Sequence, residues 1–432
     1  MSKSTDQWKL AKHIVDNMES TRYLKKENEW ICTILAFALI PISGFAIDVY
    51  IPSFPEMVND LHTSPANVKL TMTIYLISYG LSQLLMGSLI DSYGRYRINL
   101  ISLATFSLSC IAVGLTSNIP LILLLRFIQG ISISLVMLSR RAFIIDVYSG
   151  EKRKHYTSLL TVVWSTAPIV APFAGGFLQA SFGWRSNFYF LAAYGFIMLI
   201  LELIYGGETI KERMRFHYQS IWQAYKTMLT ANDFSLGLVV LGFSYSMVMA
   251  FGMSIPFIVE HTFNASPIVS GNCALFSGAA IFAGGLIGKR LINKPLYTKL
   301  VTANTIQLVL AIAMYIVGGL YFTLLSMMLF VVAIHLFQGF TYNGYFTYCV
   351  TRFPQYAATA SGVASGGSYL VFSAASFIVT SSINIVDQKT LSISYIIFIV
   401  LVSAFLWLVR SALRKKNQAD IKFAEVALAE QV

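Results

Sequence analysis

The sequence repeatedly contains uninterrupted apolar stretches of about 20 residues, which is the length of a helix that crosses a hydrocarbon core of about 30 Å. A chain in lipid must satisfy its backbone hydrogen bonds internally, so stretches of this length are predicted to be helices. Only 12% of the residues are charged, against roughly 25% in a soluble domain. The pattern predicts an all-α polytopic membrane protein and disfavours soluble enzymes, nucleic-acid readers and disulfide scaffolds.

Charged and turn residues divide these stretches into twelve expected spans. They lie near residues 31–55, 67–90, 98–117, 119–139, 156–180, 187–206, 234–259, 268–288, 299–319, 322–347, 358–382 and 391–409. An even number of spans places both ends of the chain on one side of the membrane.

The positions of the basic residues predict which side that is. With a cytoplasmic amino terminus, nearly all of the 31 Lys and Arg residues fall in inner segments, while Lys69, Arg185 and Lys389 fall in outer loops and Arg126 in a span. The positive-inside rule therefore predicts that both termini are cytoplasmic. The expected location is the cytoplasmic (inner) membrane. It also accounts for the net charge of +11 without a nucleic-acid partner.

The polar stretches predict the organisation into domains. Residues 1–30 form a cytoplasmic segment, either a surface helix or a solvated tail, without a signal-peptide cleavage pattern. The hydrophilic stretch 207–233 is predicted to link two six-helix bundles, 31–206 and 234–410, and residues 411–432 form a cytoplasmic tail.

The two halves share an internal repeat. Pro52, Glu56, Ser64 and Pro65 resemble Pro256, Glu260, Ser266 and Pro267, and Arg126, Gln129 and Gly130 resemble His335, Gln338 and Gly339. The matches predict a duplicated six-span unit, the parallel repeat that encloses a site near the bilayer midplane in transporters.

Four ionisable residues lie clearly inside expected spans: Asp48, Arg126, Glu202 and His335. Such residues usually face a cavity or one another. Asp48 and Arg126 have similar depths in the outer half, which allows an ion pair. Asp48 either takes part in proton coupling or merely caps the outer end of the first span. Glu202, near an inner end, either extends to the interface or takes part in transport.

His335 belongs to a polar stripe on one face of the tenth span, together with Gln338, Tyr342 and Asn343. Lipid would not accept such a stripe, so these side chains either line a cavity or form hydrogen bonds between helices.

The inner loop between the second and third spans carries a recognisable motif. It reads Gly87-Ser-Leu-Ile-Asp91-Ser-Tyr-Gly94-Arg95-Tyr-Arg97 and resembles the G-x-L-x-D-R-x-G-R-[KR] signature of the major facilitator superfamily, with Ser92 and Tyr96 as departures. We interpret it as a structural latch, and Asp146 is the expected partner of Arg95.

Four further motifs resemble those of the 12-span drug:proton antiporters, in particular the Bcr/CflA multidrug-efflux branch. The first span carries Asp48-Val-Tyr50-Ile-Pro52, and the fourth carries Arg126-x-x-Gln129-Gly130. The fifth span carries the antiporter motif with its prolines and glycines, Pro168, Pro172, Gly175 and Gly176, and Gly183-Trp184-Arg185 opens the sixth. The prolines and glycines also fit a simple bend in a packed helix.

The resemblance implies a transporter, not an enzyme, with two pseudo-symmetric six-helix bundles that exports small amphiphilic molecules in exchange for protons. We expect proton coupling at Asp48 and Arg126. The candidates for the cavity lining or for substrate contact are Tyr50, Gln129, His335, Gln338, Tyr342 and Asn343. The expected partners are a small-molecule substrate, protons and the lipid bilayer, and we expect a monomer without cofactor or metal.

Two alternatives stay open. The first is an exporter of a dedicated metabolite or siderophore. The second is a polytopic membrane enzyme, which would need a catalytic His or Ser/Asp constellation at one depth. The sequence contains no nucleotide-binding motif, so transport would draw its energy from an ion gradient. The four cysteines lie far apart in apolar segments, without zinc-ligand spacing.

Overall fold

The computed structural model describes residues 22–429 apart from residues 88–89, 91–92, 211–217, 292–293 and 354–355. The expected helix within residues 1–30 therefore lies almost entirely outside the described residues. Within them the chain is helical, and the one β-bridge joins Tyr23 to Glu208. The predicted all-α membrane fold is confirmed.

The first half contains the helices α2 (Glu29–Leu39), α3 (Ile42–Asp48), α4 (Phe54–Asp60), α5 (Pro65–Leu85), α7 (Arg95–Leu115), α8 (Ile119–Val147), α9 (Gly150–Phe182) and α10 (Arg185–Tyr205). Short 3₁₀ turns occupy η1 (Lys26–Asn28) and η2 (Ile51–Ser53). The first expected span is thus a broken helix. Pro41 has no backbone N–H to donate, and Pro52 interrupts the next turn, so the segment bends on both sides of Asp48.

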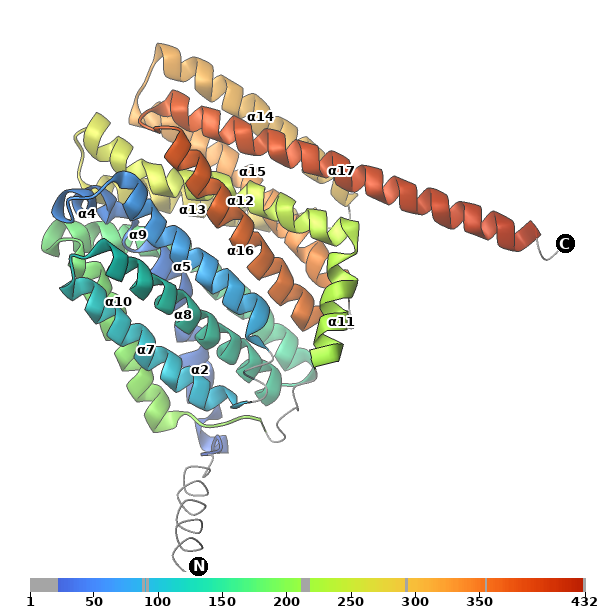
Figure 1. Ribbon diagram of the computed structural model, residues 1–432, viewed down its shortest axis with the longest axis horizontal. Coiled ribbons are helices and arrows are strands. Elements are labelled where there is room, and N and C mark those ends of the chain that lie inside the picture. The colour runs from blue at the N-terminus through green and yellow to red at the C-terminus, as the bar shows by residue number, and fades with distance from the viewer. Residues whose placement is uncertain are drawn as a thin grey trace, which may run out of the picture.

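The second half contains α12 (Asn232–Phe257), α13 (Pro267–Arg290), α14 (Leu296–Leu320), α15 (Leu324–Thr351), α16 (Ala357–Ser382) and α17 (Gln388–Ala429), with a π-helical turn η3 (Ile258–Thr262) after α12. The helix α11 (Tyr218–Leu229) lies between the halves. In Figure 1 the first-half helices lie side by side at the lower left and the second-half helices at the upper right, and α17 continues well beyond the bundle.

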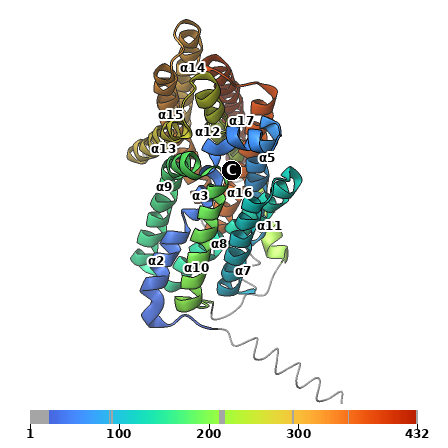
Figure 2. The same cartoon turned by 90° about the vertical axis from the view of Figure 1, so that its left-hand side faces the viewer.

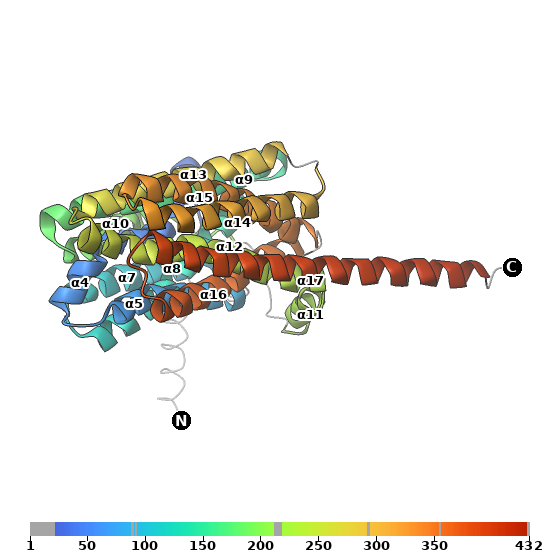
Figure 3. The same ribbon diagram turned by 90° about the horizontal axis from the view of Figure 1, so that it is seen from above.

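The packing repeats between the halves. The helix α7 packs between α8 and α10, as α14 packs between α15 and α17. Two pairs of helices join the halves: α5 packs against α16, and α9 packs against α13 (Figure 3). In each pair the second spanning helix of one half meets the fifth of the other, so the interface has the pseudo-symmetry that the repeat predicts. Figure 2 shows the molecule turned by 90°: the second-half helices α12, α13, α14 and α15 lie in the upper part, and the first-half helices α2, α7 and α10 lie in the lower part.

Ten segments of the described chain are long and apolar enough to span a membrane, and they correspond to ten of the twelve expected spans. The other two expected spans are α5 and α9, helices of 21 and 33 residues that run alongside the rest. These two helices supply most of the first-half contacts with the second half. Their Ser, Thr, Tyr, Pro and Gly residues lower the hydropathy, and several of these are buried in protein, including Thr71 and Tyr75 of α5 and Pro172 and Gly175 of α9.

The two membrane faces are named here by residues that mark them. The Asp146 face carries the end of α8 and the starts of α7 and α9, and the Trp184 face carries the end of α9 and the starts of α5 and α10. Lys69 was counted with the outer loops although it falls at the edge of the expected span 67–90. The loop assignment is wrong: Lys69 lies within α5 near the Trp184 face and is 7% exposed.

Candidate functional site

Arg126 lies at the centre of the first bundle and is completely buried. Its Nη1 donates to Gln129 Oε1 at 2.8 Å, and its Nη2 donates to the Ala46 carbonyl at 3.0 Å and to the Tyr50 hydroxyl at 3.2 Å. Its Nε donates to the Thr71 carbonyl at 3.4 Å. The planar guanidinium thus ties α8 to both α3 and α5 through neutral acceptors.

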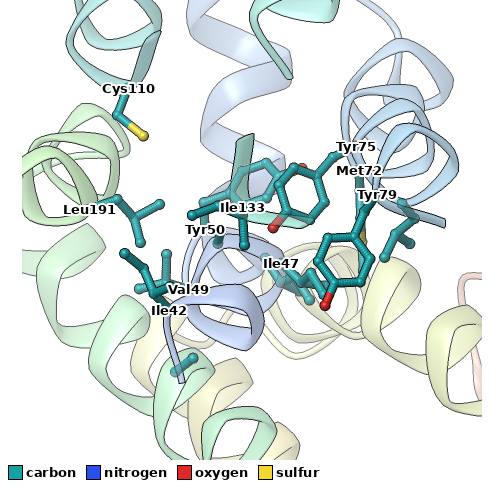
Figure 4. Close-up of a cluster of buried hydrophobic side chains, with 14 of the residues drawn as sticks. Ile42, Ile47, Val49, Tyr50, Met72, Tyr75, Tyr79, Cys110, Ile133 and Leu191 are labelled. Atoms are coloured by element: carbon teal, nitrogen blue, oxygen red, sulfur yellow. The ribbon is translucent and has the colours of Figure 1, made fainter. Parts of the chain in front are cut away.

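Aromatic rings supply the rest of the surroundings of this charge. The Arg126 Cζ atom lies 4.4 Å from the Tyr75 ring centroid, 4.5 Å from that of Tyr50 and 5.9 Å from that of Phe188. Figure 4 shows Tyr50 and Tyr75 together in this cluster of buried side chains, with Tyr79 beside them. Ring faces attract cations, and more strongly where water is excluded. Arg126 is therefore accommodated in the bundle without a carboxylate.

Asp48 lies at the other side of its helix, at the interface between the bundles. It lines a small pocket whose walls come from both halves: Gly44, Ile47, Leu76 and Pro168 from the first, and Tyr245, Met249, Tyr369 and Phe372 from the second. Among the described residues, Asp48 has no hydrogen bond and no ion pair within 4.0 Å, and the ion pair with Arg126 that their depths allowed does not form. Asp48 is thus a buried carboxylate, 7% exposed, and its surroundings are the residues that line this pocket.

The second-half wall of this pocket is aromatic. The Phe372 ring lies 4.9 Å from Tyr245 and 4.8 Å from Tyr369, and Tyr369 lies 4.9 Å from Tyr79 of α5. Tyr245 also lies 5.3 Å from Tyr342. The sequence assigned no role to Tyr245, Tyr369 or Phe372, because aromatic residues are spread through every span and no spacing distinguishes these three.

The polar stripe of α15 is divided between interior and surface. His335 is completely buried and joined on both sides: its Nδ1 lies 2.6 Å from Ser277 Oγ and its Nε2 lies 2.9 Å from the Tyr395 hydroxyl. The structure therefore gives His335 the second of the two roles left open, a hydrogen bond between helices of one bundle. Asn343 is exposed and donates back to the Gly339 carbonyl at 2.9 Å.

Gln338 and Tyr342 differ in their surroundings. Gln338 is completely buried, and neither its Oε1 nor its Nε2 has a hydrogen-bond partner in the structure. Tyr342 packs on Tyr245, and its hydroxyl lies 3.3 Å from Ser368 Oγ. Tyr342 is thus a second-half candidate that touches the aromatic wall of the pocket. Tyr50 and Gln129, the first-half candidates, both bond Arg126.

The fifth-span motif lies where α9 crosses two other helices. Pro168 lines the pocket beside Asp48, and Pro172 lies one turn further along α9. A Cβ atom on Gly175 would come within 1.6 Å of the Val49 carbonyl oxygen, and one on Gly176 within 2.8 Å of the Pro267 carbonyl oxygen in the second bundle. These two glycines let α9 approach the first span and α13 more closely than any larger residue would allow.

The inner-loop motif brings two predicted partners together. Arg95 forms an ion pair with Asp146, and its Nη1 also donates to the Ala142 carbonyl at 2.9 Å. Gly94 precedes α7 with φ = 95°, a left-handed conformation that favours glycine. Gly87 lies two residues beyond the end of α5, and a Cβ atom there would meet nothing within 4 Å, while Asp91 lies outside the described residues.

The linker residues Glu208 and Thr209 join this motif, which the sequence analysis missed. The Glu208 carboxylate accepts hydrogen bonds from the backbone N–H of Tyr96 at 3.2 Å, of Thr209 at 2.9 Å and of Ile210 at 3.1 Å. The Thr209 hydroxyl donates to Asp146 Oδ2 at 2.7 Å. The N-terminus of α7 has no cap of its own, so the linker supplies one.

Of the two roles left open for Glu202, extension to the interface is wrong. Its carboxylate is buried and accepts a hydrogen bond from Arg140 Nη1 at 2.6 Å, in an ion pair between α10 and α8. The two opposite charges compensate each other inside the bundle, although Arg140 Nε and Glu202 Oε2 have no hydrogen-bond partner among the described residues. Within the described residues, no cluster of three or more His, Cys, Asp and Glu side chains could hold a metal ion.

Several solved structures share the fold. A bacterial homolog of the human lysosomal transporter Spinster has a TM-score of 0.72 at 14% identity and covers 90% of this chain and 98% of its own. A nucleoside transporter has a TM-score of 0.67 at 12% identity, covering 89% and 99% of the two chains. A D-xylose–proton symporter has a TM-score of 0.63 at 14% identity, covering 87% and 97%.

Curated relatives match parts of the chain. An uncharacterised MFS-type transporter of Bacillus subtilis is 33% identical over 56% of this chain and 61% of its own length. A bicyclomycin resistance protein homolog of Haemophilus influenzae is 30% identical over 43% and 46% of the two lengths. Multidrug resistance protein D of Escherichia coli is 27% identical over 39% and 43%. The match thus spans less than two thirds of each of these relatives.

The family model described as Major Facilitator Superfamily matches residues 36–376, which is most of the chain and includes both halves of the repeat. This match agrees with the two six-helix bundles and with the solved structures that share them. The chain therefore belongs to the Major Facilitator Superfamily, a family of transporters rather than enzymes.

Proposed function

We propose that this protein is a proton-coupled secondary transporter that exports small amphiphilic molecules from the cytoplasm by alternating access. The observation that carries the proposal is the position of Asp48, a buried carboxylate without a protein partner in a pocket whose walls come from both bundles. The relatives named for bicyclomycin and multidrug resistance support drug-like substrates.

Asp48 can couple protons to movement because its charge is costly in a closed pocket. A carboxylate that leaves water without gaining a partner loses its hydration, and a bound proton removes that cost. When the bundles separate on one side, water reaches the carboxylate and the ionised form becomes favourable. Protonation and the direction in which the pocket opens are therefore linked.

The side chains that line this small pocket also suit an amphiphilic molecule, which we propose enters when the bundles separate and the pocket widens. Tyr245, Tyr369 and Phe372 offer ring faces on the second-half side, and Asp48 offers one negative or hydrogen-bonding group on the first-half side. A mostly apolar cavity with few polar groups is the usual form of a small-molecule site. A substrate that displaces the proton from Asp48 would be exported in exchange for it.

The orientation follows from the basic residues. We propose that the Asp146 face is cytoplasmic, that both termini lie on that side of the inner membrane, and that the Trp184 face is outer. We further propose that the two six-helix bundles, residues 31–206 and 234–410, move as rigid bodies joined by the linker 207–233. We also propose that the protein acts as a monomer.

The test is transport by everted membrane vesicles under an imposed pH gradient, acid inside. The panel contains phenicols, dyes, bicyclic peptides and an iron-loaded siderophore. We expect gradient-dependent uptake of several amphiphiles, abolished by Asp48→Asn and retained by Asp60→Asn, which changes an exposed carboxylate paired with Arg185 on the same segment. Uptake of the siderophore alone would contradict multidrug export, and uptake without a gradient would contradict proton coupling.

A further inference from the structure

Lys69 is a buried cation held entirely by the opposite bundle. Its Nζ donates to the Thr380 carbonyl of α16 at 3.0 Å and lies 5.6 Å from the Phe257 ring centroid of α12. In the described chain, no carboxylate lies within 4.0 Å of this ammonium group. We refer to Lys69, Thr380 and Phe257 as the Lys69 clasp.

The Lys69 clasp closes the Trp184-face end of the bundle interface. Phe257 packs 6.4 Å from Phe54 of the first half, and the Thr380 hydroxyl contacts Met253 Sδ at 3.7 Å. Each member of the clasp lies two helical turns beyond a residue that lines the Asp48 pocket: Lys69 beyond Leu76, Phe257 beyond Met249 and Thr380 beyond Phe372. A molecule that leaves the pocket toward this face must part the clasp.

The closed clasp replaces the hydration of the ammonium group with one carbonyl and one ring face. A lysine ammonium has three donors and is strongly hydrated, so one hydrogen bond and one ring contact leave it poorly compensated. Replacement of buried charges by apolar side chains of similar size often stabilises a packed structure. When the clasp opens, water restores the hydration, so the positive charge favours the open state over the closed one.

We infer that Lys69 is a positioning residue that sets how readily the Trp184 face opens, because its charge is buried only when that face is closed. The inference rests on the proposed alternating access and is independent of which substrate is carried. A methionine at this position keeps the apolar stem without the charge and stabilises the closed clasp. An arginine keeps the charge and preserves the opening.

The test measures how fast a cysteine in the clasp reacts from outside. Thr380→Cys is made in the full-length chain, whose four native cysteines are buried, and cells are treated with a membrane-impermeant maleimide. Thr380 is 3% exposed, so its thiol reacts only while the clasp is open. We expect Lys69→Met to slow the labelling roughly tenfold, with Lys69→Arg close to the parent protein.

The matched control is Lys389→Met. Lys389 lies on the same face and over an aromatic ring, 5.9 Å from Tyr315, but both residues belong to the second bundle. We expect no change in labelling there. Faster labelling in Lys69→Met would show instead that the hydrogen bond holds the face shut, and an unchanged rate would show that the charge has no effect; either overturns the inference. If Lys69→Met does not fold, Lys69→Gln replaces it with the same expected direction.

The labelling result can be interpreted independently of the transport test of the proposed function. Labelling reports opening whether or not a drug is exported, so failure to find a substrate leaves this result intact. Normal export by a parent Thr380→Cys protein that never labels would contradict the inference, because the clasp then does not part during transport.

Discussion

His335 illustrates how far one buried residue can be interpreted from its partners. Both ring nitrogens are engaged, by Ser277 and by Tyr395, and all three residues belong to the second bundle. His335→Ala would leave a cavity and two unpaired hydroxyls, so we expect it to lower the free energy of unfolding by about 2–4 kcal/mol. Thermal unfolding of the purified protein measures this loss.

The same contacts predict what His335 does not do. His335 does not line the pocket around Asp48, so His335→Gln, which keeps a donor and an acceptor, should retain proton-coupled transport. If a His335→Gln protein folds but transports without a pH gradient, His335 of α15 is needed for proton coupling and this prediction is wrong.

At the scale of elements, the start of α7 depends on a residue from the linker. Glu208 is buried and accepts three backbone N–H groups, one of them at the α7 N-terminus. Glu208→Ala removes this cap, which is worth about 1 kcal/mol, and loosens the contact between the linker and the Arg95–Asp146 pair. We expect a lower melting temperature and slower transport with nearly unchanged substrate affinity, compared with the control Glu27→Ala at an exposed ion pair. If the Glu208→Ala protein has normal stability and a normal transport rate, the linker does not contribute to the function of the inner-loop motif.

The helix α9 depends on two glycines for its close approach to its neighbours. Gly175→Ala would drive a Cβ atom into the Val49 carbonyl oxygen within the first bundle, so we expect a strongly destabilised protein, by about 3 kcal/mol or more. Gly176→Ala meets Pro267 across the interface and should weaken the contact between bundles instead. Gly344→Ala is the control, because a Cβ there would meet its nearest neighbour at 3.9 Å. Equal melting temperatures for Gly175→Ala and Gly344→Ala would contradict this account.

At the scale of the whole molecule, the proposed orientation makes a direct prediction. His62 is exposed on the Trp184 face and Lys152 on the Asp146 face. In intact cells we expect His62→Cys to react with an impermeant maleimide and Lys152→Cys to react only after the membrane is opened. The reverse pattern would invert the topology.

Much of the fold could be predicted because its signals are local. Apolar length predicts the spans, the repeat predicts the halves, and the pairing of Arg95 with Asp146 follows from a motif and a shared membrane face. The contacts of Lys69, Glu202 and Glu208 could not be predicted. Each depends on a partner at least 60 residues away in sequence, and a charge near a helix end is usually solvated.

The site shows the same division. Asp48 could be singled out because a carboxylate deep in a span is rare. Its separation from Arg126 could not be foreseen, since equal depth says nothing about which side of a helix two groups occupy. The aromatic wall of Tyr245, Tyr369 and Phe372 arises only when α12 and α16 meet the first bundle.

The central claim is that Asp48 exchanges a proton when substrate binds. The most direct measurement is proton release by purified protein in weakly buffered detergent solution, recorded with a pH indicator when a transported amphiphile is added. The account predicts release by the wild-type protein and none by Asp48→Asn, which should still fold and bind. Release of the same size by a folded, substrate-binding Asp48→Asn protein would contradict it and leave Asp48 with a structural role only.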